Sequence, residues 1–281
     1  MSQAVSAGQP GLSGGWWLDV AGMRDALHAE WTKLRTVAGP AWLLAATVVL
    51  TVAVSAAATA AARCPSGTVC PKDTTKLSLT GIQAGQAVVA ILAVLAISGE
   101  YSTGMIRITL AAMPRRSAVL AAKAVILAAL VLAAGAIAVG GSVLAGRILL
   151  PGHGFTVARG FPLESVADGP TLRAAAGSVL YLVLIALLSL GIATLIRDSA
   201  AAIGVVLGLL YRSPIILGVV TDPVWSHRLE RYAPMSAGLT IQDTTGLRSL
   251  PISPWGGLGV LAAWAAVALL AGVVFLRWRD A

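Results

Sequence analysis

The chain has 281 residues, of which 57% are hydrophobic and only 11% are charged. Soluble domains carry about 25% charged residues, so this composition excludes a protein whose surface lies mainly in water and indicates that lipid is its main solvent. The formal net charge of +8 lies mostly between apolar runs, which suits anionic lipid headgroups. No nucleic-acid partner is expected, because the sequence has no basic stripe with interleaved aromatic residues.

The N-terminal segment divides into two parts. Residues 1–15 are polar and rich in glycine, so we expect them to be disordered, and they lack the apolar core of a cleavable signal peptide. Residues 16–38 are predicted to form an amphipathic helix, because apolar side chains recur at spacings of three and four: Val20, Met23, Leu27, Trp31 and Leu34. We interpret this helix as interfacial, lying on the membrane before the first span. A solvated cytoplasmic helix is the alternative.

Residues 39–281 are predicted to form one transmembrane domain. A bilayer core about 30 Å thick needs about 20 helical residues, and lipid cannot satisfy a free backbone N–H or C=O group. The apolar runs are rich in alanine and glycine, which lets helices pack closely. The predicted fold is an all-α integral membrane protein with six transmembrane helices, at about residues 40–62, 81–99, 118–146, 172–196, 199–220 and 255–276.

Cys64 and Cys70 are the only cysteines of the chain and follow the first predicted span. Pro65 and Gly67 help the chain turn between them, so the pair could close a small disulfide loop on an oxidising side of the membrane. Two free thiols are the alternative. No metal site is expected, because a structural zinc site needs about four ligands and no histidine lies near the cysteines.

Lysine and arginine residues divide equally between the two sides of this six-span arrangement. The positive-inside rule gives most weight to charges next to span ends. Such charges precede the first span, open the third and follow the sixth: Lys33, Arg35, Arg115, Arg116, Arg277 and Arg279. They favour cytoplasmic N- and C-termini, with the cysteine pair outside.

Residues 99–116, between the second and third spans, are too polar to cross a membrane and too regularly patterned for a slack loop. Ser102 or Thr103 can cap a short helix, and Pro114 ends it. Its apolar face consists of Met105, Ile106, Leu110 and Met113. With charge from Glu100 and Arg107, a short cytoplasmic helix parallel to the membrane would suit docking of a soluble partner. An ordinary interfacial connector is the alternative.

The fifth predicted span contains a charge, Arg212, in the sequence Tyr211-Arg212-Ser213-Pro214. It lies roughly 20 Å along a helix that begins at Ser199, in the outer third of the bilayer, where an arginine can reach the headgroups. Ser213 and Pro214 resemble a helix cap and a first helical residue. We therefore expect the span to break here and a short re-entrant helix to follow, to about Val220. Arg212 could line a pathway or act as a structural arginine.

The loop sequence Glu100-Tyr101-Ser102-Thr103-Gly104-Met105-Ile106-Arg107, followed by Leu110-Ala111-Ala112-Met113-Pro114-Arg115-Arg116, resembles the first cytoplasmic loop of bacterial permeases of the type-2 ATP-binding cassette (ABC) transporter family. Residues 30–35 resemble the helix before that family's first span, and residues 276–281 resemble its charged tail. Residues 232–238 resemble its outer loop, although an asparagine is more usual in place of Ser236 or Ala237.

The resemblance implies a permease half in a bacterial cell membrane, paired with a second permease subunit, identical or different, around an export pathway. Separate ATPase subunits would hold ATP and Mg²⁺. The family's coupling helix, which fits a groove on the ATPase, would comprise Glu100, Tyr101, Ser102, Thr103, Gly104, Met105, Ile106, Arg107, Arg115 and Arg116. The family also has an outer hairpin between its last two spans. This chain is expected to hold no catalytic residue or cofactor, because it has no Gly-x-x-x-x-Gly-Lys-Ser/Thr sequence.

Three other classes of function compete with an exporter. An intramembrane enzyme needs a nucleophile and base, or a metal pair, inside the spans, but all three histidines lie outside them. An ion-coupled secondary transporter usually carries ionisable groups at mid-membrane, where these spans offer essentially Arg212. A non-transporting scaffold or immunity-type protein is the third. The Ala, Gly, Leu and Val of the spans favour a lipophilic cargo.

Overall fold

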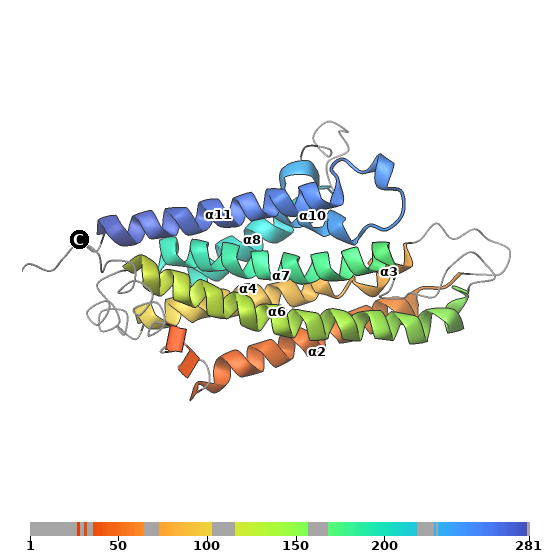
Figure 1. Cartoon of the computed structure of the whole chain (residues 1–281), viewed down its shortest axis with the longest axis horizontal. Helices are drawn as coiled ribbons and strands as arrows, with labels where there is room; N and C mark the ends of the chain where they lie inside the picture. The colour runs from red at the N-terminus through yellow and green to blue at the C-terminus, as the bar shows by residue number, and fades with distance from the viewer. Residues whose placement is uncertain are drawn as a thin grey trace, which may run out of the picture.

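The computed structural model describes residues 27–28, 31–32, 36–64, 73–102, 116–156, 168–217, 228 and 230–279. Every regular element in these ranges is a helix, as predicted (Figure 1). Six helices form the body of the molecule: α2 (Ala38–Ala61), α4 (Ile82–Ser102), α6 (Arg116–Leu149), α7 (Gly169–Ile196), α8 (Ser199–Leu217) and α11 (Pro254–Arg279). Short elements join them: α3 (Thr74–Ser78), η1 (Leu150–His153), α10 (Pro234–Leu239), η3 (Thr240–Gln242) and η4 (Leu247–Ser249).

Among the described residues, five helices are long and apolar enough to cross a membrane, namely α2, α4, α6, α7 and α11. Their bounds lie within a few residues of five of the six predicted spans. The apolar part of α8, Ser199–Ser213, is shorter. By length and composition the described chain is therefore an all-α, multi-pass membrane protein. The predicted disordered segment, residues 1–15, lies outside the described residues, as does most of residues 16–38.

Polar contacts fix the relative direction of the helices. The Ser199 hydroxyl at the start of α8 donates to Ser98 near the end of α4, at 2.8 Å, and Tyr211 of α8 donates to the Gln83 carbonyl near the start of α4. Helices α4 and α8 are therefore antiparallel. In Figure 1 the start of α2, the end of α4, the start of α6 and the end of α11 lie together on the left, which we call the terminus end. Helices α3 and α10 lie toward the opposite end, the α3 end.

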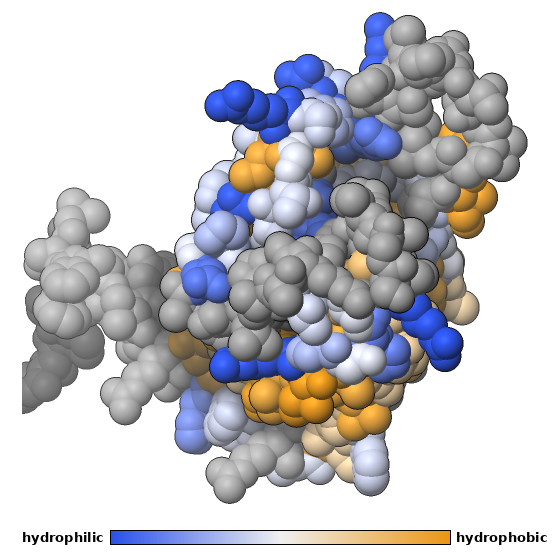
Figure 2. All heavy atoms as spheres, turned by 90° about the vertical axis from the view of Figure 1, so that its right-hand side faces the viewer, coloured by the Kyte–Doolittle hydropathy of each residue, from blue (hydrophilic) through white to orange (hydrophobic). Residues whose placement is uncertain are grey.

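The α3 end carries much of the polar surface. Figure 2 looks directly at it and shows hydrophilic residues over much of the described part of this face, with hydrophobic groups between them and a larger one below. A polar end face suits water and lipid headgroups, whereas the flanks of the bundle expose large apolar side chains such as Trp42, which is 75% exposed, and Val267. The long axis of the bundle is therefore the direction in which the helices would cross a bilayer.

Helix α2 turns its polar side inward. Its four buried residues all carry hydroxyl groups and recur every four positions: Thr47, Thr51, Ser55 and Thr59. The threonine hydroxyls donate to carbonyls four residues earlier in the same helix, at 2.6–3.0 Å. Ser55 instead accepts a hydrogen bond from the backbone N–H of Gly81 at 3.0 Å. These hydroxyls are satisfied without water, so the apolar side of α2 is left to face lipid.

The start of α4 and the residue before it meet this hydroxyl stripe with glycines. A Cβ atom on Gly81 would lie 1.9 Å from the Thr51 carbonyl oxygen, and one on Gly85 would lie 2.1 Å from Thr51 Oγ1. Any side chain at either position would push the helices apart, so small residues set the close approach of α2 and α4. Gly191 plays the same part between α7 and α11, since its Cβ would lie 2.6 Å from the carbonyl carbon of Ala268.

The prediction that the fifth span breaks at Ser213 is wrong. Helix α8 runs without interruption through Pro214 to Leu217, so no new helix begins at Ser213. Proline has no N–H to donate to the carbonyl four residues earlier. The Ser213 hydroxyl donates to that carbonyl, Leu210 O, at 3.5 Å, a long hydrogen bond that compensates in part for the missing one. Residues 218–227 lie outside the described ranges.

Candidate functional site

The last turn of α4 holds a buried ion pair. Glu100 is 8% exposed and Lys123 of α6 is 5% exposed, and Lys123 Nζ lies 3.0 Å from Glu100 Oε1. Charges leave water at a high cost unless they are paired, and each of these side chains compensates the charge of the other. The pair fastens the end of α4 to α6 two turns after α6 begins.

This placement corrects the sequence prediction for Glu100. We expected the second span to end at Gly99 and Glu100 to supply charge on a surface helix. Instead α4 continues through Ser102, which carries Glu100 into the interior beside Lys123. The carboxylate is tolerated inside the bundle because the lysine compensates its charge.

Tyr101 contacts the turn between α7 and α8. The guanidinium carbon of Arg197 lies 5.2 Å from the centre of the Tyr101 ring, a cation–π distance. Arg197 has a φ of 62°, a left-handed conformation that is uncommon for residues other than glycine and reverses the chain within two residues. Asp198 then caps α8 by accepting from the N–H of Ala201 at 2.8 Å.

The end of α4 is thus held on two sides, by α6 through Lys123 and by the α7–α8 turn through Arg197 and Ser199. We call these contacts the α4 anchor. Of the predicted coupling residues, Glu100 and Tyr101 belong to it, Ser102 ends α4 and Arg116 begins α6. The others lie outside the described residues: Thr103, Gly104, Met105, Ile106, Arg107 and Arg115.

A second candidate site is a cavity of about 230 Å³ between α8, the segment leading into α10, and α11. Its lining includes Leu209, Arg212 and Ser213 of α8, Arg228, and Trp264 of α11. The Trp264 indole donates to the Tyr232 carbonyl at 3.1 Å, which holds one wall of the cavity to the next. We call it the Arg212 cavity.

The three residues singled out in the fifth span do not act together. Arg212 is exposed and lines the cavity, whereas Tyr211 points to α4, where its hydroxyl donates to the Gln83 carbonyl. Pro214 lies within α8. Adjacent residues of a helix project about 100° apart, so a contiguous motif on a helix reaches different neighbours.

Sequence reasoning missed a buried polar chain beneath α10. The Tyr181 hydroxyl donates to Gln86 Oε1, and Gln86 Nε2 donates to Met235 Sδ at 3.3 Å. Gln242 Nε2 donates to Ser178 Oγ at 3.2 Å. These contacts hold α10 and η3 against α4 and α7. The sequence feature that could have predicted these contacts is Gln86, an amide side chain inside an apolar run.

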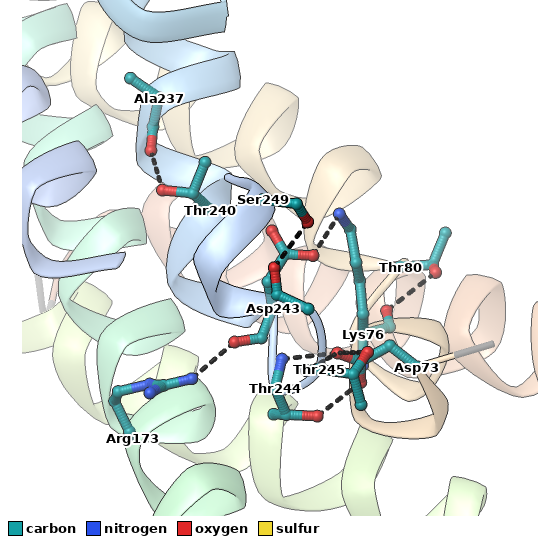
Figure 3. A network of polar contacts seen from close by, with 11 residues as sticks. Asp73, Lys76, Thr80, Arg173, Ala237, Thr240, Asp243, Thr244, Thr245 and Ser249 are labelled. Carbon is teal, nitrogen blue, oxygen red and sulfur yellow. Dashed lines mark hydrogen bonds and ion pairs between the residues drawn. The ribbon is translucent and has the colours of Figure 1, made fainter. Parts of the chain in front are cut away.

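A network of hydrogen bonds closes the α3 end (Figure 3). Asp73 caps α3 and accepts from the backbone N–H of Thr244 at 2.5 Å and of Thr245 at 3.0 Å. Lys76 Nζ lies 2.6 Å from Asp243 Oδ1, and Arg173 of α7 donates to the Asp243 carbonyl at 2.5 Å. We call this group the α3 clamp. It joins segments about 170 positions apart, so no local pattern could predict it.

The cysteine prediction is tested at one residue. Cys64 is disulfide-bonded and its N–H donates to the His153 carbonyl at 3.0 Å; Cys70 lies outside the described residues. Within the ranges that the structure describes, no three His, Cys, Asp or Glu side chains are grouped so that they could hold a metal ion.

Comparison of the sequence with models of known protein families gives no match, and comparison with curated proteins gives none either. Any functional conclusion therefore rests on the sequence patterns and on the geometry of the α4 anchor, the Arg212 cavity and the α3 clamp.

Proposed function

We propose that the chain is the transmembrane permease subunit of an ATP-driven exporter of the type-2 ABC family, working as a dimer with separate ATPase subunits. The observation that carries the proposal is that residues 100–116, which resemble the family's coupling loop, join two helix ends that are firmly held. The α4 anchor ties Glu100 and Tyr101 to α6 and to the α7–α8 turn. A force applied to residues 103–115 would therefore reach four helices at once.

Such anchoring is what coupling to a motor requires. A partner can shift a two-state equilibrium only through contacts that differ between the states. If the loop were joined to frayed helix ends, movement of the ATPase would be absorbed locally. A loop joined to a buried ion pair transmits it, because the charges cannot separate inside the bundle without a large cost.

The proposal includes a sixth membrane crossing by α8. Helix α7 leads to the terminus end and α11 starts toward the α3 end (Figure 1), so the chain between them must travel the length of the bundle. Helix α8 has 19 residues, which gives about 28 Å of rise, close to the roughly 30 Å of a bilayer core. An even number of crossings places both termini and residues 103–115 on one side, which we assign to the cytoplasm of a bacterial cell.

The first test is the side on which the loop lies. Single cysteines at Thr103 and Met105, in a chain whose Cys64 and Cys70 are replaced by serine, are treated with a membrane-impermeant maleimide in intact cells and after permeabilisation. We expect labelling only after permeabilisation. A cysteine replacing Arg248 of η4, at the α3 end, is the control and should react in intact cells. Labelling of Thr103→Cys from outside would overturn the proposal.

The second test is physical association with a motor. The tagged chain, cross-linked in its native membrane, should co-purify with an ATPase whose sequence carries a phosphate-binding loop. The double variant Arg107→Ala/Arg115→Ala should reduce recovery at least about fivefold, which corresponds to roughly 1 kcal/mol, whereas Arg248→Ala should not. Equal recovery with all three chains would contradict coupling through this loop.

One observation favours a second candidate, an ion-coupled secondary transporter. Ionisable residues buried among apolar helices often belong to ion pathways, and Glu100 and Lys123 are such a pair. Transport that continues without ATP but collapses when a protonophore dissipates the proton gradient would select this alternative. Transport by sealed vesicles that requires ATP and survives the protonophore would exclude it.

A further inference from the structure

We propose that α8 is a hinged gate, fixed at the terminus end and able to swing away from α10 at the α3 end. The swing would open the Arg212 cavity into a lateral passage between α8 and α11, for the apolar part of a molecule dissolved in the bilayer. Any role of this passage in export rests on the proposed function, whereas the hinge does not.

Both ends of α8 are joined to a neighbouring helix by the same kind of serine pair. At the terminus end, Ser199 donates to Ser98 of α4 at 2.8 Å. At the α3 end, Ser236 of α10 donates to Ser213 at 2.9 Å. Ser98 and Ser213 each donate in turn to a carbonyl of their own helix, so separating either pair would break one hydrogen bond. The surroundings of the two pairs therefore decide which end opens.

The terminus end of α8 is held by further contacts. Arg197 lies over the Tyr101 ring at 5.2 Å, and Asp198 caps the first turn of α8. Only these two residues separate the end of α7 from the start of α8, and Arg197 has a φ of 62°. Hinges are a few residues at the ends of elements that absorb the change in backbone dihedrals. This turn can therefore redirect α8 while its first residue stays in place.

The α3 end of α8 borders the Arg212 cavity instead. Ser213 and Leu209 line one side of this space of about 230 Å³, and Trp264 of α11 lines another. An empty space takes away packing contacts that would otherwise resist separation of the helices. Besides the serine pair, the hydroxyl of Tyr211 donates to the Gln83 carbonyl of α4. Among the described residues, these two hydrogen bonds hold the gate closed.

Helix α10 is not free to follow α8. A Cβ atom on Gly238 would lie 2.6 Å from the Tyr181 ring of α7, and one on Gly257 of α11 would lie 2.0 Å from the Ala237 carbonyl oxygen of α10. Contacts this close fix α10 to α7 and α11. The contact between α8 and α10 is therefore the place where the bundle can separate.

The passage would open toward lipid. Across the described part of the chain, α8 and α11 hardly contact each other, although both pack against α7 and α10. Val205 lies one turn from Leu209 on α8, and Val267 lies one turn from Trp264 on α11. Both valines are exposed, and the cavity between the helices is largely apolar. A molecule entering here would therefore present an alkyl or aryl group.

The hinge is tested by the reactivity of two matched cysteines in the full-length chain, reconstituted in vesicles, with Cys64 and Cys70 replaced by serine. Ser213 and Ser98 are 2% and 1% exposed, and each lies four residues before the end of its helix. We expect Ser213→Cys to react with N-ethylmaleimide at least about tenfold faster than Ser98→Cys, because local opening exposes it. Ser236→Cys replaces Ser213→Cys if the latter is not monodisperse. Equal rates, or faster reaction of Ser98→Cys, would overturn the hinge.

The passage is tested with two engineered disulfides in the same background, Ser213→Cys/Ser236→Cys at the gate and Ser98→Cys/Ser199→Cys at the hinge. The hydroxyl oxygens of each pair lie within 2.9 Å, so both pairs should close on oxidation. The probe is the lipophilic reagent trifluoromethyl-iodophenyl-diazirine, and the readout is photolabelling of Leu210, which is buried on α8, measured by mass spectrometry.

Oxidation of the gate pair should lower labelling of Leu210 at least about fivefold, and dithiothreitol should restore it, whereas oxidation of the hinge pair should leave it unchanged. Labelling that ignores the gate disulfide, or responds equally to both, would refute the passage. Neither measurement uses ATP or a partner protein, so the outcome is independent of whether the chain is an exporter.

Discussion

Lys123 of α6 holds Glu100 of α4 across 3.0 Å inside the bundle, at the point where the chain leaves α4 for residues 103–115. The pair makes the end of a membrane helix more firmly fixed than its sequence suggests. It also means that substitutions at Glu100 act on stability as well as on any partner, so the two effects have to be separated by experiment.

The first prediction concerns this pair. Lys123→Ala should lower the free energy of unfolding by about 3 kcal/mol or more, because it leaves a buried carboxylate without its counterion. Lys76→Ala is the matched control, since the Lys76 side chain is 49% exposed in its pair with Asp243 and exposed pairs contribute about 0–1 kcal/mol. Thermal unfolding in detergent, followed by size-exclusion chromatography, measures both. Equal losses would show that burial does not set the strength of these pairs.

The second prediction concerns the contact of α2 with α4. Gly81→Ala should destabilise the protein by about 1–3 kcal/mol, the usual effect of overpacking, because its Cβ would overlap the Thr51 carbonyl oxygen. Gly140→Ala on α6, where nothing lies within 4 Å of the new Cβ, should be neutral or slightly stabilising through helix propensity. The same unfolding measurement compares them. A neutral Gly81→Ala would mean that the helices do not approach as closely as described.

The third prediction concerns the buried chain beneath α10. Tyr181→Phe removes the hydroxyl that donates to Gln86 Oε1, and the unsatisfied amide should cost about 1–3 kcal/mol. Gln86→Leu in the same chain removes the orphaned acceptor, so the double variant should regain part of the loss. Unfolding energies of the two single variants and the double variant form the cycle. Simple additivity would indicate that the two side chains do not interact.

The fourth prediction concerns the α3 clamp. Asp73→Ala should loosen residues 243–249, because the carboxylate accepts two backbone N–H groups and caps α3; a loss of about 1–2 kcal/mol is expected. Hydrogen exchange of this segment should rise, while exchange in α7 stays unchanged. Asp168→Ala is the control, since Asp168 precedes α7 without a side-chain cap bond. Unchanged exchange in Asp73→Ala would rule out the clamp as the force that orders this end.

The sequence predicted the long helices because lipid imposes a local requirement, namely about 20 apolar residues in a helix whose backbone groups are all bonded. It did not predict the partners of Glu100 or Asp73, because pairing depends on which helix faces meet. The error at Pro214 has another cause. In soluble proteins a proline usually marks the end or the start of a helix, but inside this bundle the Ser213 hydroxyl compensates in part for the missing N–H donor.

The candidate site was predicted in part. The polar loop after α4 and the charge at Arg212 stand out from apolar surroundings, and both mark places where the structure concentrates contacts or a cavity. Arg197 and Lys123 could not be assigned to the α4 anchor in advance, because a positive charge near a helix end has many uses. The glycine at position 177 could not be explained from the sequence either. Ile241 packs so closely against it that a Cβ atom on Gly177 would lie 2.0 Å from the Ile241 side chain.

The stripe on α2 has a consequence for motion. Hydroxyls every four residues on α2 face two glycines four residues apart, Gly81 just before α4 and Gly85 within it, so a displacement of α2 by one repeat, about 6 Å, would bring other hydroxyls of the stripe toward the same two glycines. The threonines keep their hydrogen bonds during such a slide, because their acceptors travel with the helix. The bond from the Gly81 N–H to the Ser55 hydroxyl would break in such a displacement, so it holds α2 in its present alignment with α4.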